Sequence, residues 1–212
     1  MNTFTAGSCI KFGWETFKKR AWFFIGSTAL VLCALWILNM LGNGTRDMGL
    51  LHLVIALIVY GLSVLIDMGM IAFFLKAHDD ASSVKLADLY HARSFWNYLV
   101  AVVVVAILTV IGLVLLIVPG VILILMWAFV KFLIVERDIG AFDAMKESAR
   151  ITKGSRLDLL LLMLFAVIIN IVGAILLGVG LLVTIPVSLL AVTHAYRMLS
   201  AKAGAAALSP AA

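Results

Sequence analysis

Charged residues are scarce in this chain of 212 residues, at 13% of the total, and hydrophobic residues make up 65%. The mean hydropathy is +1.19, which lies well above the range of soluble globular domains. A soluble domain of this size could not bury so much apolar surface. The composition therefore excludes the soluble class and predicts an all-α polytopic membrane protein.

The residues that most enzyme and metal sites need are also few. Cys9 in the N-terminal segment and Cys33 in the first apolar run are expected at different depths, which argues against a disulfide. The histidines are scattered, and the His-Asp-Asp run at 78–80 with His91 has no recognised metal spacing, so a solvated loop is expected there. The sequence contains no Ser-His-Asp constellation, phosphate-binding glycine loop or CxxC motif. We therefore expect no enzyme activity, no cofactor and no metal.

Long uncharged runs dominate the chain instead. A bilayer core of about 30 Å needs about 20 helical residues. Residues 21–45 and 50–75 each supply one span, whereas 94–130 and 159–196 are each long enough for two. A cleaved signal peptide is the competing interpretation of the first run, although the run exceeds the usual apolar region of such peptides. The predicted helices cover residues 22–41, 50–75, 95–118, 120–136, 158–177 and 181–199.

Two breaker clusters lie near the midpoints of the longest apolar runs. They are Pro119-Gly120 and the Gly178-Val179-Gly180 run. Each is expected to form the turn of a helical hairpin. With the first two spans, this gives six transmembrane helices in three hairpins.

Positive charge is concentrated between the apolar runs. Residues 1–20, 76–94, 137–156 and 197–212 hold 14 of the 16 Lys and Arg residues. Under the positive-inside rule, these segments and both termini are expected in the cytoplasm. The net charge of +5 then indicates contact with anionic lipid rather than nucleic acid, because no basic segment is interleaved with aromatic residues.

A stretch with helical periodicity precedes each hairpin. The first places apolar residues on one face from Ala6 through Trp14 to Phe17, and the third places them from Phe142 to Thr152. Leu86, Leu89 and Tyr90 mark a shorter version before the second hairpin. Each is predicted to be a cytoplasmic amphipathic helix.

The recurring order suggests one membrane domain over residues 1–200 and a disordered tail over 201–212. Three repeat units about a pseudo-threefold axis are one interpretation, and convergent membrane-protein composition is the other. The repeat units would cover residues 1–78, 79–138 and 139–200.

Three motifs follow one another in the second half of the chain: VPGVI at 118–122, VERD at 135–138 and GAFDAMKES at 140–148. In these motifs the chain resembles the YciC-like family of bacterial inner-membrane proteins and the membrane domain of some glycerophosphoryl diester phosphodiesterases. The resemblance implies six helices in a bacterial plasma membrane, without a settled biochemical activity. None of these positions matches the catalytic motif of the soluble phosphodiesterase domain, so its residues are not carried over.

Four polar residues stand out within the predicted spans. A carboxylate such as Asp67 is costly in hydrocarbon unless it is paired, hydrated or protonated, so it is either part of a proton or ion relay or a buried anchor. Lys131 is its candidate partner, although the lysine side chain can also extend to the cytoplasmic boundary. Asn170 lies on a stripe of small residues and is expected to bond a neighbouring helix rather than a substrate. His194 is the fourth polar position.

Two groups of cations on the predicted amphipathic helices are candidates for binding lipid headgroups or an acidic partner. Simple topology signals would look the same. We predict a non-enzymatic protein that organises membrane lipids or a partner protein in envelope homeostasis. The alternative is a small transporter or channel with a polar path near Asp67, Asn170 and His194. The candidate cations are Lys11, Lys18, Lys19, Arg20, Lys146, Arg150, Lys153 and Arg156.

Overall fold

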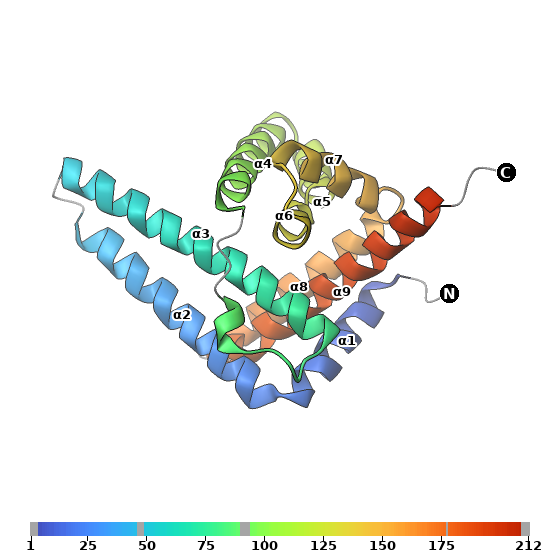
Figure 1. The fold of residues 1–212 in the computed structure, drawn as a ribbon, viewed down its shortest axis with the longest axis horizontal. Coiled ribbons are helices and arrows are strands. Elements are labelled where there is room, and N and C mark those ends of the chain that lie inside the picture. Colours follow the sequence, from blue (N-terminus) through green and yellow to red (C-terminus); the bar gives the residue numbers. More distant parts are fainter. Residues whose placement is uncertain (1–3, 46–48, 90–93, 177, 209–212) are drawn as a thin grey trace.

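The computed structural model describes residues 4–45, 49–89, 94–176 and 178–208, and in these ranges it contains helices and no strand (Figure 1). Six helical segments are long and apolar enough to cross a membrane, which confirms the predicted number of spans. The architecture is that of a multi-pass membrane protein. The elements are α1 (Ala6–Lys19), α2 (Ala21–Gly44), α3 (Leu50–Asp79), the 3-10 turn η2 (Leu86–Leu89), α4 (Phe95–Leu115), α5 (Ile117–Met126), α6 (Val130–Arg137), α7 (Ala141–Thr152), α8 (Arg156–Ile175) and α9 (Leu181–Leu208).

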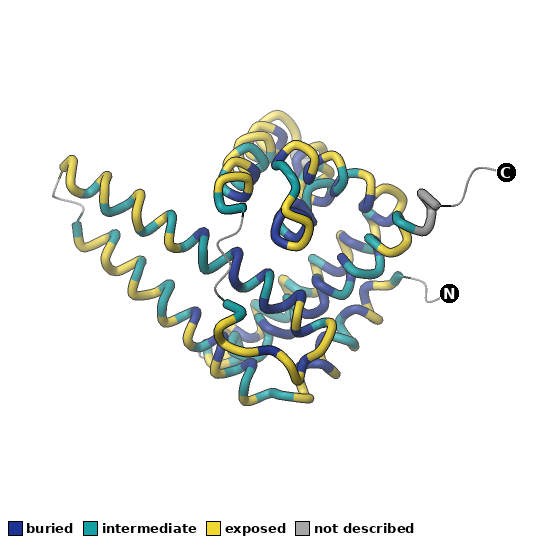
Figure 2. Tube along the Cα trace, viewed as in Figure 1, coloured by how far each residue is buried: buried dark blue, intermediate teal, exposed yellow. Residues whose placement is uncertain are grey.

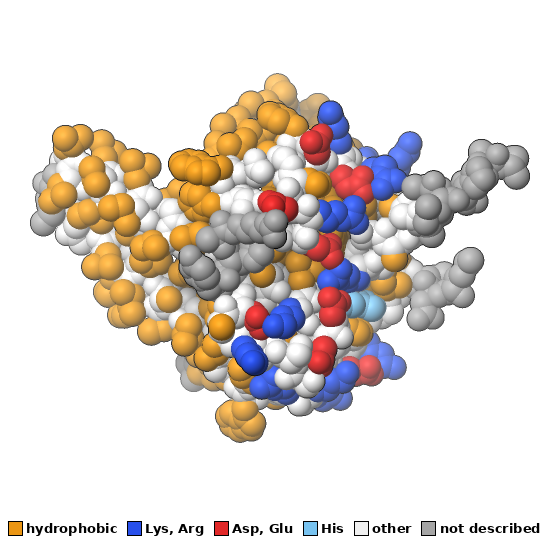
Figure 3. Space-filling model, in the orientation of Figure 1, with side chains coloured by type: hydrophobic (Ala, Val, Ile, Leu, Met, Phe, Trp, Pro, Cys, Tyr) orange, Lys and Arg blue, Asp and Glu red, His pale blue; other side chains and the backbone are white. Residues whose placement is uncertain are grey.

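Helices α2 and α3 run side by side and reach away from the rest of the molecule (Figure 1). Their outer parts are mostly exposed, and buried residues concentrate where α3 meets α6 and α9 (Figure 2). Figure 3 shows charged side chains toward the side where α1, α7 and the end of α9 lie, and hydrophobic side chains over the outer ends of α2 and α3. We call the first region the charged end. An exposed apolar surface of this extent fits contact with lipid.

Helix α1 packs along α9 through small residues. A Cβ atom on Gly13 would lie 2.5 Å from the carbonyl oxygen of Val187, so only glycine allows this approach. Cys9, one turn earlier, is completely buried. Trp14 was expected on the same apolar face, but 46% of it is exposed, whereas Thr16 is buried. The face of α1 that packs on α9 is therefore rotated from the predicted one.

The fourth span is not the single helix predicted over residues 120–136. It consists of α5 and α6, with a turn at Trp127 to Phe129 between them. Two hydroxyls of α7 satisfy the backbone groups that the break frees. Ser148 Oγ donates to the Met126 carbonyl oxygen at 2.8 Å and accepts from the Phe129 N–H at 3.2 Å. Thr152 Oγ1 lies 3.5 Å from the same carbonyl oxygen.

The turn between α4 and α5 lies at Leu116, whose backbone is extended, rather than at Pro119-Gly120. Pro119 lies in the first turn of α5, where its missing N–H costs no helical hydrogen bond. Gly178 does lie in the turn between α8 and α9, with a φ of +74° that favours glycine. Gly180 follows it, and a Cβ there would lie 2.6 Å from the Gly173 carbonyl oxygen.

The helices before the hairpins differ more than the predicted repeat implies. The second is only the 3-10 turn η2, and Tyr90 lies outside the described residues. In α7 the buried face carries Ser148 and Ile151, while Phe142 is 64% exposed, contrary to the predicted stripe. Helix α9 continues to Leu208, so the first part of the predicted disordered tail is helical.

Candidate functional site

Two histidines from distant parts of the chain meet at the charged end. His78, in the last turn of α3, lies with Nε2 2.9 Å from Nδ1 of His194 on α9. The ring of Phe12 from α1 stacks on His194 with centroids 4.0 Å apart. A cavity of about 250 Å³ opens beside His78 and Phe12. The two histidines and Phe12 therefore join α1, α3 and α9. His194, which the sequence suggested as part of a transport path, has its partners in this cluster.

A charged network lies next to the histidines. Arg197 of α9 donates to Asp79 of α3, with Nη2 and Oδ2 2.6 Å apart, and also pairs with Glu136 of α6. The hydroxyl of Tyr196 donates to the same Glu136 carboxylate. Charge-assisted hydrogen bonds of this kind are stronger than neutral ones. The network holds the ends of α3 and α6 against α9.

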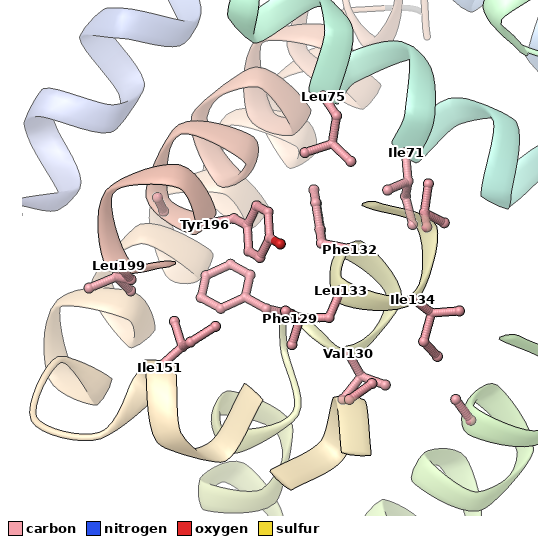
Figure 4. Close-up of a cluster of buried hydrophobic side chains, with 14 of the residues drawn as sticks. Ile71, Leu75, Phe129, Val130, Phe132, Leu133, Ile134, Ile151, Tyr196 and Leu199 are labelled. Carbon is pink, nitrogen blue, oxygen red and sulfur yellow. The ribbon is translucent and has the colours of Figure 1, made fainter. Parts of the chain in front are cut away.

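The network rests on an aromatic cluster. The Tyr196 ring lies between Phe129 and Phe132, with centroid distances of 5.6 and 5.3 Å. Figure 4 shows these three rings directed toward one another from α9 and the segment around α6, with Leu75 of α3 and Leu199 of α9 beside them. All five residues are buried. The aromatic packing fixes where the Tyr196 hydroxyl can reach Glu136.

Asp67 and Lys131 form the ion pair that the sequence suggested. Lys131 Nζ lies 2.6 Å from Asp67 Oδ2, and the hydroxyl of Tyr98 donates to the same oxygen at 2.6 Å. Tyr98 lies in the first turn of α4 and is completely buried. The cluster thus connects α3, α4 and α6 near the start of α4.

Asn170 bonds a neighbouring helix, as expected. Its Nδ2 donates to Ser188 Oγ of α9 at 3.0 Å and to the Ala166 carbonyl oxygen at 2.8 Å. The two other residues of the suggested transport path, Asp67 and His194, have different partners. The structure therefore does not join Asp67, Asn170 and His194 in one hydrogen-bonded cluster.

Arg20 is a structural tie rather than an open cation. Its Nη1 donates to three carbonyl oxygens of the loop after α3, and its guanidinium lies 4.2 Å from the centroid of the Phe23 ring. These bonds hold the junction of α1 and α2 against that loop. The accepting residues are Ala81, Ser82 and Val84, at 3.2, 3.0 and 3.2 Å.

Arg150 is also engaged. Its Nε and Nη2 each lie 2.7 Å from a carboxylate oxygen of Glu147, and Arg137 reaches the same carboxylate at 3.3 Å. The hydrogen bonds from Arg150 hold the pKa of Glu147 below its ordinary value, and the carboxylate in turn raises the pKa of Arg150. This bidentate pair leaves Arg150 with less capacity to bind an external anion.

The six other predicted cations differ in accessibility. Lys11 lies 3.9 Å from Glu15 in an exposed pair that contributes little to stability, and Arg156 is half-buried. The remaining four are exposed and have no partner among the residues that the structure describes. They lie on, or directly after, α1 and α7, which both pack on α9. We call them the lysine surface: Lys18, Lys19, Lys146 and Lys153.

The cysteines and possible metal ligands carry little chemistry in the described part of the chain. Both cysteines are free. Burial raises the pKa of the Cys9 thiol to about 11, which keeps it protonated. No group of three His, Cys, Asp or Glu side chains converges within the described ranges, and His91 lies outside them.

Sequence reasoning missed Glu136, Arg197, Tyr98 and the contact between His78 and His194. Glu136 and Arg197 were visible as charges near the ends of predicted spans, where ion pairs between helices are common. Nothing local indicated which helices would meet. The hydrogen-bonded partners in this network lie 60 or more positions apart in the chain.

Comparisons with known proteins found no matching family model, no similar curated protein and no similar solved structure. Functional inference therefore rests on the residues and their geometry. Those residues can do two things: join helices through charged hydrogen bonds, and offer lysines to anionic groups at the charged end.

Proposed function

We propose that this chain is a non-enzymatic scaffold of a bacterial inner membrane that organises anionic lipids at its charged end. The single observation behind this proposal is the lysine surface, whose four ammonium groups are exposed beside apolar side chains that are also exposed. Trp22 at the start of α2 is 88% exposed, and Phe142 of α7 projects from the same helix as Lys146. Cations next to exposed aromatic residues are typical of helices at a membrane interface.

The magnitude is sufficient for lipid recruitment. Each lysine near an anionic leaflet contributes about 1 kcal/mol, so two lysines on one helix contribute about 2 kcal/mol, or roughly 30-fold in local lipid preference. Because these charges are exposed, the preference falls as salt concentration rises. The engaged cations Arg20 and Arg150 contribute less, since each already bonds within the protein.

Cytoplasmic termini and membership of the YciC-like family are part of the same proposal. The positive-inside rule supports this orientation, because four segments between and beside the apolar runs hold 14 of the 16 Lys and Arg residues. Motifs VPGVI, VERD and GAFDAMKES support the family assignment. The separate partners of Asp67, Asn170 and His194 favour a scaffold over a transporter.

Spin-labelled lipids in reconstituted bilayers test this function. We expect the protein to bind phosphatidylglycerol more tightly than phosphatidylcholine. Replacing Lys18 and Lys19 by Gln should lower that preference at least about threefold, and replacing Lys146 and Lys153 should do the same. A matched double variant with equal loss of charge is Lys85→Gln with Lys202→Gln, since both residues are exposed and neither belongs to the lysine surface. An equal decrease in the control, or no preference in the unaltered protein, would refute the proposal.

A further inference from the structure

A groove of about 430 Å³ runs between α4 and the broken fourth span. Ala101, Val105 and Ala106 of α4 line one side, Trp127 lines the other, and Met163 of α8 also lines it. The volume lies in the range of small-molecule sites, and the lining is almost entirely apolar. The exposed α4 and α5 flanks place the groove where lipid chains lie.

The groove has a polar end and an apolar end. Lys131 lines it, and its Nζ lies 5.8 Å from the centroid of the Tyr98 ring, three residues before Ala101, the first α4 residue of the lining. Val110 is the last α4 residue of the lining, nine residues after Ala101. At a rise of about 1.5 Å per residue, the two residues lie about 14 Å apart along the helix axis. The polar end is nearest the start of α4, so the groove runs from there into the apolar part of the bundle. This is the orientation that a lipid anchored by its headgroup would require.

The ion pair at the polar end has unused hydrogen-bonding capacity. An ammonium group has three donors, and Lys131 uses one of them, on Asp67. Asp67 Oδ2 accepts from both Lys131 and Tyr98, while Oδ1 has no partner among the described residues. The two side chains remain 44% and 46% exposed. A half-exposed pair at the edge of an apolar groove needs a polar group to satisfy it.

We propose that this groove binds one acyl chain of a phospholipid whose headgroup carries a primary ammonium and a phosphate. The phosphate accepts from the remaining N–H groups of Lys131, and the ammonium donates to Asp67 Oδ1. Charge complementarity selects this headgroup, because the protein offers a cation and a carboxylate side by side. An anionic headgroup without an ammonium would place its phosphate against Asp67, and a quaternary ammonium has no N–H to donate. None of these residues belongs to the lysine surface, so the proposal goes beyond the proposed function.

Photolabelling of the full chain in phosphatidylcholine bilayers tests the site. Trace phosphatidylethanolamine, phosphatidylglycerol or phosphatidylcholine carries a diazirine in one acyl chain, and mass spectrometry quantifies the labelled peptides of α4 and α5. We expect phosphatidylethanolamine to label them about tenfold more than the other two, the size of one charge-assisted hydrogen bond. Equal labelling by the three probes would overturn the proposal.

Three variants separate the chain site from the headgroup site. Ala106→Trp fills the groove and should abolish most labelling, whereas Val103→Trp, on an exposed part of α4 outside the groove, should leave it unchanged. The double variant Asp67→Asn with Lys131→Gln keeps a hydrogen-bonding pair but removes both charges, so it should retain labelling and lose the headgroup preference. Equal effects of the two Trp substitutions, or an unchanged preference in the double variant, would contradict the site without affecting the lysine surface.

Discussion

The contact between α1 and α9 predicts a specific effect of Gly13→Ala. The added methyl group would lie 2.5 Å from the Val187 carbonyl oxygen and 3.1 Å from the Ala191 backbone nitrogen. Neither backbone atom can rotate away, so α1 must shift. Overpacking of this kind costs about 2–3 kcal/mol, and the better helix propensity of alanine returns about 1 kcal/mol. The free energy that opens α1 from α9 should therefore fall by about 1–2 kcal/mol, which favours opening about 5-fold to 30-fold.

Cys9 reports this opening directly. Its side chain is completely buried, and burial raises its pKa to about 11, so a maleimide should react only when α1 opens. In a Cys33→Ala background, labelling of Cys9 in Gly13→Ala should be about 5-fold to 30-fold faster than in the parent. The rate is measured by mass spectrometry over time under native conditions.

Gly7→Ala is the matched control, because it makes the same change on the same helix. No heavy atom lies within 4 Å of a Cβ at Gly7. Alanine there should only strengthen the helix, by up to about 1 kcal/mol, and labelling of Cys9 should stay equal or become slower. If Gly13→Ala labels no faster than Gly7→Ala, the close approach of α1 to α9 does not govern the position of α1.

Two further predictions concern ion pairs. Asp67→Asn should destabilise the protein by about 1–2 kcal/mol, because Lys131 loses its counter-charge. Adding Lys131→Met should recover most of this loss, measured by thermal unfolding in detergent, and additive effects of the two substitutions would rule out the pair. Hydrogen bonds from Lys76 and the Lys85 amide lower the pKa of Asp88 in the folded protein. The stability that these bonds give is therefore present above the pKa of Asp88 in the unfolded chain, about 3.9, and is lost as pH falls through its lower pKa in the folded protein. Hydrogen exchange of the Lys85 amide, corrected for its intrinsic pH dependence, should therefore accelerate below about pH 4 in the parent. In Asp88→Asn, which has no carboxylate to protonate, the corrected exchange rate should show no such acceleration.

The sequence predicted the features that depend on local properties. The number of spans follows from the length of the apolar runs, and the observed helices include most of each predicted range. Burial of Cys9 and Gly13 follows from helical periodicity. The same reasoning failed at Trp14 and Phe142, because a large apolar side chain on such a helix can face lipid as well as protein, and periodicity does not distinguish the two.

The break between α5 and α6 depends on contacts with α7, about 20 residues further along the chain, and local sequence patterns do not predict such contacts. The freed carbonyl oxygen of Met126 is satisfied only because Ser148 and Thr152 reach it from α7. No breaker residue marks residues 127–129, so local propensity predicts a continuous helix there. The Pro119-Gly120 pair showed the opposite case: a recognisable breaker signal that the structure accommodates within the first turn of α5.

By itself, then, the sequence determined that the chain has six segments long and apolar enough to cross a membrane, and where its cations lie, since hydrophobic run length and charge placement are properties of consecutive residues. Only the tertiary structure decided which cations are engaged and which are open. Arg20 and Lys18 are alike in sequence terms, yet one bonds the loop after α3 and the other is exposed. The physical reason is that hydrogen bonds and ion pairs depend on distances of a few ångströms between residues far apart in the chain, and the tertiary packing of helices and loops sets those distances.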